Sequence, residues 1–141
     1  MKMAMVASLL SGAAALAQTK PQTKSPTEKE YESLIYSIKG PDLFRAHCSA
    51  CHGSDGKGGG PLAPALKVKP ANLTVLAKAN GGKFPADRVR EFISGDKVVA
   101  SHGSREMPIW GAIFHQIEED QDFGNVRLQN LVKYLESIQE K

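Results

Sequence analysis

The sequence contains little cysteine, few aromatic side chains and no long apolar segment. Its 141 residues include only two cysteines, and aromatic residues make up 6% of the chain. Two cysteines leave no spare pair for a disulfide framework and no four-cysteine zinc site. The longest apolar stretch, residues 3–16, is too short and too rich in Ala, Gly and Ser for a membrane-spanning helix. The length fits one small domain.

The N-terminus has the features of a secretory signal peptide. Lys2 provides a positive start, residues 3–16 are apolar, and Ala15-Leu16-Ala17 forms an A-x-A cleavage site. The alternative is that this segment is retained as an anchor. We therefore predict three parts: a signal peptide over residues 1–17, an N-terminal extension with a tether and a short helix over residues 18–38, and a folded domain over residues 39–141.

Both cysteines belong to the run Cys48-Ser49-Ala50-Cys51-His52-Gly53. A C-x-x-C-H run is typical of covalent haem attachment. Thiols three positions apart on a helix lie on one face, so both can form thioethers with the two vinyl groups of one haem. The histidine that follows can then serve as the proximal ligand of the iron. The motif predicts one haem c, held by Cys48 and Cys51 and ligated by His52.

Three other uses of a C-x-x-C pair are less well supported. A redox dithiol is expected within a βαβ pattern, which this sequence does not show. A zinc site needs four ligands, and there is no second cysteine pair. An ordinary disulfide would give no reason for the histidine that follows Cys51.

Apolar residues recur at helical spacing in several short segments. The capping box Thr27-x-x-Glu30 precedes one such stripe. No segment alternates apolar and polar residues as a strand does, so the predicted fold class is all-α with four to five short helices. The stripe after the capping box consists of Tyr31, Leu34, Ile35 and Ile38. Further helices are predicted over residues 42–51, 73–79, 85–94 and 125–139.

A haem iron bound by His52 has one more position for a ligand. Three of the four methionines fall in the first five residues, so Met107 alone remains after signal cleavage. A methionine thioether is the usual sixth ligand of electron-transfer cytochromes, and Pro108 would hold the local backbone in place. We predict that Met107 is this ligand. The rival candidates are the histidines His102, His115 and His47.

With the runs at residues 48–53 and Met107-Pro108-Ile109-Trp110-Gly111 both present, the chain resembles a class I c-type cytochrome. It is similar to the cytochrome c domains of bacterial respiratory oxidases, over roughly residues 39–140. The resemblance implies an all-α fold wrapped around one covalently bound haem. It also implies assembly outside the cytoplasmic membrane, which agrees with the export signal and predicts a periplasmic protein.

The resemblance further implies two structural details. The helix over residues 42–51 should cross the helix over residues 125–139, with Phe44 and Tyr134 at the crossing. A proline carbonyl after the haem-binding helix should accept a hydrogen bond from the proximal histidine and increase its basicity. The candidates for that carbonyl are Pro61 and Pro64.

These features predict an electron carrier that moves one electron between respiratory or other redox partners, and not an enzyme with a small-molecule substrate. A haem subunit of a larger respiratory complex is the first alternative. A ligand-binding haem enzyme or sensor is the second, with His102 and Arg105 as the nearby polar groups. Peripheral contact with membrane respiratory complexes is compatible with the first two hypotheses.

The charge pattern gives the only indication of partners. Residues 118–122 include four acids and no base, whereas residues 57–90 are basic with Asp87 as the one acid. Such a dipolar chain would be steered toward acidic redox proteins. Nucleic acid is not an expected partner, because the net charge of +3 is small and no basic-aromatic pattern is present. The basic residues are Lys57, Lys67, Lys69, Lys78, Lys83, Arg88 and Arg90.

Overall fold

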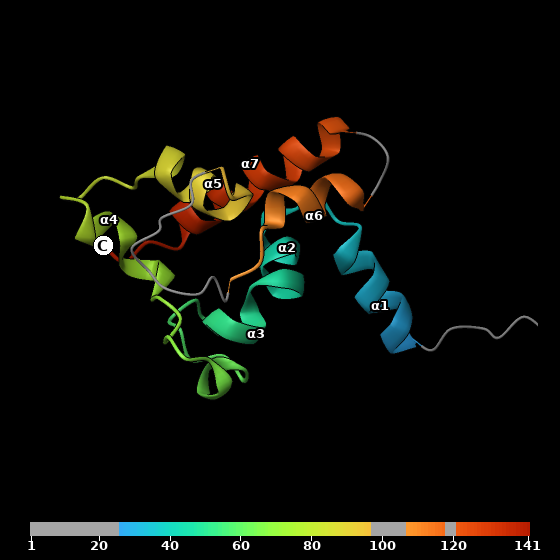
Figure 1. Ribbon diagram of the computed structural model, residues 1–141, viewed down its shortest axis with the longest axis horizontal. Helices are drawn as coiled ribbons and strands as arrows, with labels where there is room; N and C mark the ends of the chain where they lie inside the picture. The colour runs from blue at the N-terminus through green and yellow to red at the C-terminus, as the bar shows by residue number, and fades with distance from the viewer. Residues whose placement is uncertain (1–25, 97–106, 118–120) are drawn as a thin grey trace, which may run out of the picture.

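The computed structural model describes residues 26–96, 107–117 and 121–141. Within these ranges every regular element is a helix and no strand is present, which confirms the all-α class (Figure 1). The α-helices are α1 (Pro26–Ile35), α2 (Gly40–His47), α3 (Ser49–His52), α4 (Leu76–Ala79), α5 (Ala86–Ser94), α6 (Trp110–Gln116) and α7 (Gln121–Ser137). Two short 3-10 helices are η1 (Ala63–Ala65) and η2 (Leu73–Val75).

The described helices outnumber the four to five predicted from the sequence. The predicted helix over residues 42–51 is divided at Cys48, whose backbone angles are φ −114° and ψ −36°. Helix α6 was not predicted, because its apolar run is short and contains Gly111. Helix α7 begins at Gln121, before the predicted start near residue 125.

Helix α7 is the element on which the fold is assembled. It contacts α2, α5 and α6, and Figure 1 shows these helices gathered along it. The apolar stripe predicted for α7 supplies four of the buried residues, which pack against side chains from α2, α5 and α6. Apolar burial of this kind is the main stabilising contribution to a small domain. The buried apolar residues are Leu43, Phe44, Phe84, Ile93, Phe114, Leu128, Leu131, Val132 and Leu135.

The crossing of α2 and α7 agrees with the one implied by the resemblance. The rings of Phe44 and Tyr134 meet there with centroids 5.4 Å apart and planes inclined by 52°. Tilted aromatic pairs at this separation are favourable. Gly40, at the start of α2, lies directly against α7, where an added Cβ would contact the Asn130 carbonyl oxygen. The N-terminal and C-terminal helices of the domain are therefore in close backbone contact.

The end of the N-terminal extension is held against α7 by a buried arginine. Arg127 has no exposed surface, and its guanidinium donates to the carbonyl oxygens of Tyr36 (3.3 Å), Ser37 (3.4 Å) and Phe114 (3.4 Å). The side chain of Asn130 donates to the Ile38 carbonyl at 2.8 Å. The connection between α1 and α2 therefore packs as part of the folded structure.

The stripe predicted on the first helix is only partly covered. Leu34 and Ile35 are half-buried, whereas Tyr31 is 59% exposed and Ile38, which lies beyond the helix end, is 38% exposed. Helix α1 contacts α2. The prediction that this stripe packs against the domain holds for the two middle residues and fails for the two outer ones.

Several predictions concern residues outside the described ranges. These are the signal peptide, the tether, the loop over residues 98–105 with His102 and Arg105, and most of the acidic run over residues 118–122. Among the described helices, none combines the length and the apolar character needed to cross a membrane.

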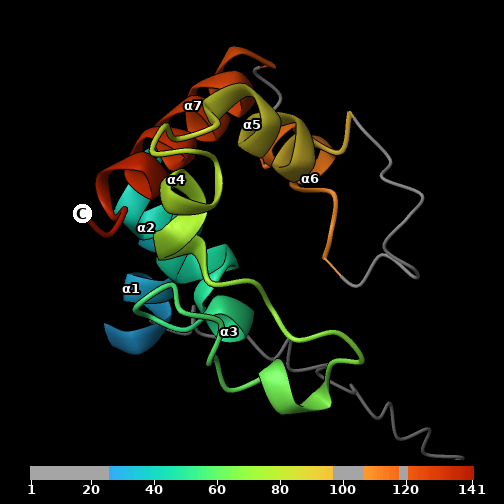
Figure 2. The same ribbon diagram turned by 90° about the vertical axis from the view of Figure 1, so that its left-hand side faces the viewer.

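Figure 2 shows how the remaining elements are placed. The chain from α3 through η1 lies on one side, and α5 and α6 lie on the other, with α4 nearer α2 and α7. In both views residues 107–109 run from the start of α6 toward α3. Two segments singled out in the sequence therefore come toward each other from opposite sides of the fold.

Candidate functional site

The cysteines and the histidine of the C-x-x-C-H run occupy a single helical turn. Cys48 joins α2 to α3, and its carbonyl oxygen accepts hydrogen bonds from the amides of Cys51 (3.2 Å) and His52 (2.9 Å). Both cysteines are free thiols and are half-buried. The two thiols therefore stand three positions apart on one helical turn, with His52 directly after them.

The protonation of Cys48 argues against a redox dithiol. Burial raises the pKa of the Cys48 thiol to about 12, and the neighbouring Cys51 adds to the increase. Cysteines that exchange disulfides have lowered pKa values, because the thiolate is the reactive form. Before any haem is attached, Cys48 is therefore a protonated thiol at neutral pH.

His52 is oriented by a backbone carbonyl that the sequence analysis did not identify. Its Nδ1 lies 3.0 Å from the Ala71 carbonyl oxygen. A carbonyl oxygen only accepts, so Nδ1 carries the proton and Nε2 keeps the lone pair that can bind a metal. The prediction that the carbonyl of Pro61 or Pro64 fills this role is wrong, because the chain passes His52 at Ala71, after the turn that contains both prolines.

Residues beside Ala71 build a turn that holds this carbonyl in place. Asn72 caps η2, and its side-chain oxygen accepts from the Thr74 amide at 2.9 Å and from the Thr74 hydroxyl at 2.7 Å. The Leu73 amide donates to the Gly56 carbonyl at 2.7 Å. The sequence Asn72-x-Thr74 was a usable signal for such a turn, since asparagine side chains commonly cap the backbone two residues ahead.

The glycine-rich loop after His52 folds back against α3. The amide of Gly58 donates to the His52 carbonyl at 2.7 Å, and the amide of Gly60 donates to the Cys51 carbonyl at 3.0 Å. An added Cβ at Gly58 would meet the Pro70 carbonyl oxygen, and one at Gly60 would meet that of Ala50. Glycine is needed at both positions because backbone lies directly against backbone.

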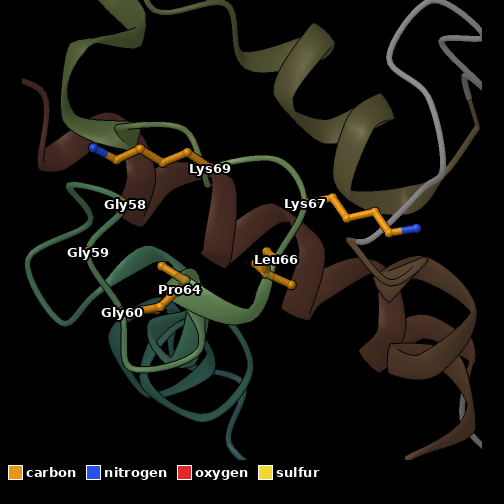
Figure 3. Close-up of a pocket in the computed structure, with 8 residues that line it drawn as sticks. Gly58, Gly59, Gly60, Pro64, Leu66, Lys67 and Lys69 are labelled. Carbon is orange, nitrogen blue, oxygen red and sulfur yellow. The ribbon is translucent and has the colours of Figure 1, made fainter.

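A cavity of about 460 Å³ lies beside this loop (Figure 3). The loop backbone forms one side of it, and Pro64 and Leu66 contribute apolar surface. Lys67 and Lys69 stand at its rim, and their side chains extend away from each other in Figure 3. The cavity is lined by Gly58, Gly59, Gly60, Ala63, Pro64, Leu66, Lys67 and Lys69.

Met107 stands at the start of the segment that leads into α6. Its side chain is half-buried and packs against the apolar core, as does that of Trp110. The Trp110 ring lies 5.1 Å from the His47 ring and 6.0 Å from the Phe114 ring, measured between centroids. This aromatic cluster fixes the beginning of α6 against α2, and with it the end of the segment that carries Met107. It also places His47 against α6.

The residues present fit a haem on three observations. His52 has Nε2 available as a neutral donor, and the two free thiols stand three positions apart on the same turn. Large apolar side chains are exposed on the chain that follows α3 and on the segment that leads into α6: Leu62 (53%), Val68 (61%) and Ile109 (43%). A flat apolar group bound here would remove such surface from water.

The all-helical fold and this site define a class I c-type cytochrome. The sequence model of the family described as "Cytochrome C oxidase, cbb3-type, subunit III" matches residues 38–135. The chain belongs to this family. Comparison of this chain with the curated proteins, and with the solved structures, found no match.

Family membership supports a haem electron-transfer role for this chain. Members carry a c-type cytochrome domain, which implies covalently bound haem c as the cofactor and the role of an electron carrier. The matched range contains both cysteines, His52 and Met107. It also contains Ala71. This residue contacts His52 through its backbone carbonyl, so its residue type does not reveal its role.

Proposed function

We propose that the protein is an exported, single-haem electron carrier of the periplasm. Cys48 and Cys51 would hold the haem through two thioethers, and His52 and Met107 would ligate its iron. The hydrogen bond from His52 Nδ1 to the Ala71 carbonyl carries this proposal, because it leaves Nε2 free and fixes the plane of the ring.

The haem supplies an iron that changes by one electron between the ferric and ferrous states. The protein residues bind and tune it. The Ala71 carbonyl makes His52 a stronger donor, and the Met107 thioether favours the ferrous state. A methionine in the sixth position also blocks the binding of external ligands, which suits a carrier better than an enzyme or a sensor.

The test of the axial ligand compares Met107→Ala with Ile109→Ala in the haem-loaded protein. Both changes shorten an apolar side chain in the same segment, but only the first removes a sulfur. We expect Met107→Ala to keep the haem, to lose the near-infrared sulfur-to-iron band and to bind carbon monoxide readily in the ferrous state. Its reduction potential should fall, because water or hydroxide stabilises ferrous iron less well than a thioether does.

The contrary result would be a native ferrous protein that binds carbon monoxide quickly and a Met107→Ala variant with an unchanged spectrum. The sixth position would then be open or ligated by a histidine, and the enzyme-or-sensor alternative would be preferred. Ile109→Ala should keep the sulfur-to-iron band and should not bind carbon monoxide readily in the ferrous state.

Attachment is tested separately with the two cysteines. We expect the double variant Cys48→Ala/Cys51→Ala to carry no haem on a denaturing gel stained for haem, and each single variant to give a lower yield of holoprotein. Normal staining of the double variant would contradict the proposed thioethers. Export is tested by the mass of the periplasmic protein, which should correspond to a chain that begins at Gln18.

A second candidate function is that of a fixed haem subunit in a larger respiratory complex. The family name describes subunit III of an oxidase, and α1 together with the residues that follow it exposes Tyr31 (59%) and Tyr36 (55%). Size-exclusion chromatography of gently solubilised cells separates the two functions. A carrier elutes alone, whereas a subunit elutes with the complex and is released when Tyr31 and Tyr36 are both changed to Ser.

A further inference from the structure

The last residues of the chain are bound to the segment that follows Ala71. The amide of Glu140 donates to the Thr74 carbonyl at 2.7 Å. The side chain of Gln139 makes two contacts with the same segment: Nε2 donates to the Leu73 carbonyl at 2.7 Å, and Oε1 accepts from the Ala77 amide at 2.9 Å. Gln139 Nε2 also donates to the Leu135 carbonyl at 2.7 Å, which anchors the amide on α7.

The carboxylate of Glu140 adds a second set of contacts. Its Oε1 accepts from the Thr74 hydroxyl at 3.0 Å and lies 3.3 Å from Lys57 Nζ. The single hydroxyl proton of Thr74 is shared between Glu140 and the Asn72 side-chain oxygen, which lies 2.7 Å away. Thr74 is 5% exposed, whereas the Glu140 side chain is 47% exposed, so the buried hydroxyl meets a carboxylate that water also reaches.

These contacts are continuous with the hydrogen bond on His52. Leu73, held by Gln139 through its carbonyl, donates through its amide to the Gly56 carbonyl in the loop that follows the haem-binding turn. Ala71 lies two residues before Leu73. The segment that presents the Ala71 carbonyl is thus fixed from α7 on one side and from the glycine-rich loop on the other.

We propose that Gln139 and Glu140 are positioning residues for His52, which hold the Ala71 carbonyl against its Nδ1–H and thereby help to set the reduction potential of the haem. This inference rests on the proposed function, in which His52 is the proximal ligand. The physical reason is exposure: the hydrogen bond between His52 and Ala71 is accessible to solvent, so water competes for both groups. Its geometry then depends on what holds the Ala71 segment in place.

The sign of the effect follows from ligand basicity. A hydrogen bond to a backbone carbonyl makes an imidazole a stronger donor, and a stronger donor favours the ferric state. When the segment is released, the Ala71 carbonyl spends less time on Nδ1–H. The reduction potential of the haem should therefore rise, and the Nδ1 proton should exchange with solvent more quickly.

The experiment uses the haem-loaded full-length protein with Gln139→Ala, and Ser137→Ala as the matched control. Ser137 lies on the same helical end, and its hydroxyl donates within α7 to the Tyr134 carbonyl at 2.7 Å. We expect Gln139→Ala to speed exchange of the His52 Nδ1 proton roughly fivefold or more, the factor equivalent to one lost hydrogen bond. The potential should rise in Gln139→Ala and stay at the native value in Ser137→Ala.

Two further variants keep the inference testable if Gln139→Ala does not fold. Gln139→Glu keeps the acceptor for the Ala77 amide but removes the donor to the Leu73 carbonyl, and Glu140→Gln removes the charge facing Lys57. Both should change exchange and potential in the same direction as Gln139→Ala. Ile138→Val trims a side chain that packs near Gly56 without removing a hydrogen bond, so it should lower stability and leave both readouts unchanged.

Failure of the inference differs from failure of the proposed function. If the native protein shows no haem-shifted Nδ1 proton for His52, the proposed ligand is wrong. If that proton is present, and neither its exchange nor the potential changes in the Gln139 and Glu140 variants, these residues have only a structural role. A control variant that changes both readouts as much as Gln139→Ala would overturn the inference equally.

Discussion

Replacing Gly111 with alanine should destabilise the protein although the new residue is the better helix former. Gly111 lies in the first turn of α6, and an added Cβ would stand 2.6 Å from the Ser94 carbonyl oxygen and 2.9 Å from its Cα, both in the backbone of α5. A backbone cannot rotate away as a flexible side chain can, so α5 and α6 must move apart.

The magnitude follows from two opposing contributions. Alanine is favoured over glycine by about 1 kcal/mol in a helix interior, which is an upper bound for Gly111 in the first turn. Overpacking a close contact costs about 1–3 kcal/mol. The clash is with main-chain atoms on a neighbouring helix, so we expect the larger end of that cost and a net loss of about 1–2 kcal/mol. Urea unfolding of the haem-loaded protein, followed by far-ultraviolet circular dichroism, measures it.

The same substitution should affect the methionine ligand. Helix α6 begins at Trp110, close after Met107, so a displacement of α6 moves the segment that carries the proposed sulfur ligand. We expect the near-infrared sulfur-to-iron band of Gly111→Ala to disappear on heating before the helices unfold. In the native protein the two transitions should coincide more closely.

Two other glycines provide the controls. Gly59→Ala meets no atom within 4 Å, and we expect its stability to stay within about 0.5 kcal/mol of the native value. Gly40→Ala clashes with α7 at a site away from Met107, so it should destabilise without early loss of the sulfur-to-iron band. A Gly111→Ala protein as stable as Gly59→Ala would refute the close packing of α5 against α6.

Three further predictions test the buried Arg127, the half-buried His47 and the basic surface. Arg127→Met should lower the free energy of unfolding, measured in urea, by about 1–3 kcal/mol, because the carbonyls bonded to the guanidinium lose their donor. An unchanged unfolding midpoint would contradict the burial of Arg127. Burial, and secondarily Arg127, lowers the pKa of His47, so the unfolded chain binds that proton more readily. The free energy of unfolding should therefore fall as the pH drops below about 6.5. In His47→Phe, urea unfolding at several pH values should show a smaller fall over this range, and an equally steep fall would disprove the role of His47. Changing Lys69 and Lys83 to Glu should slow electron transfer to an acidic protein at low salt, and the difference in stopped-flow rates should become smaller as the salt concentration increases. Equal rates at low salt would mean that these lysines do not contribute to docking.

Much of the site could be predicted from the sequence, because haem attachment depends on local chemistry. The spacing of Cys48 and Cys51 on one helical turn and the histidine that follows belong to a single run of residues, so no knowledge of the fold is needed to recognise them. Met107 was singled out by elimination among methionines, and as a ligand it stays a prediction. The amphipathic stripe of α7 was equally readable, since its apolar residues repeat at helical spacing.

Other features depended on the tertiary structure, because they involve groups that residue type does not reveal. Any residue at position 71 would offer the same backbone carbonyl. Only the path of the chain therefore decides that Ala71, and neither Pro61 nor Pro64, orients His52. Its charge alone would place Arg127 on the surface. Its burial on α7 is favourable because it donates to three carbonyls, two from the connection between α1 and α2 and one from α6. In both cases the partners are main-chain atoms distant in sequence, and the folded chain alone brings them within hydrogen-bonding distance.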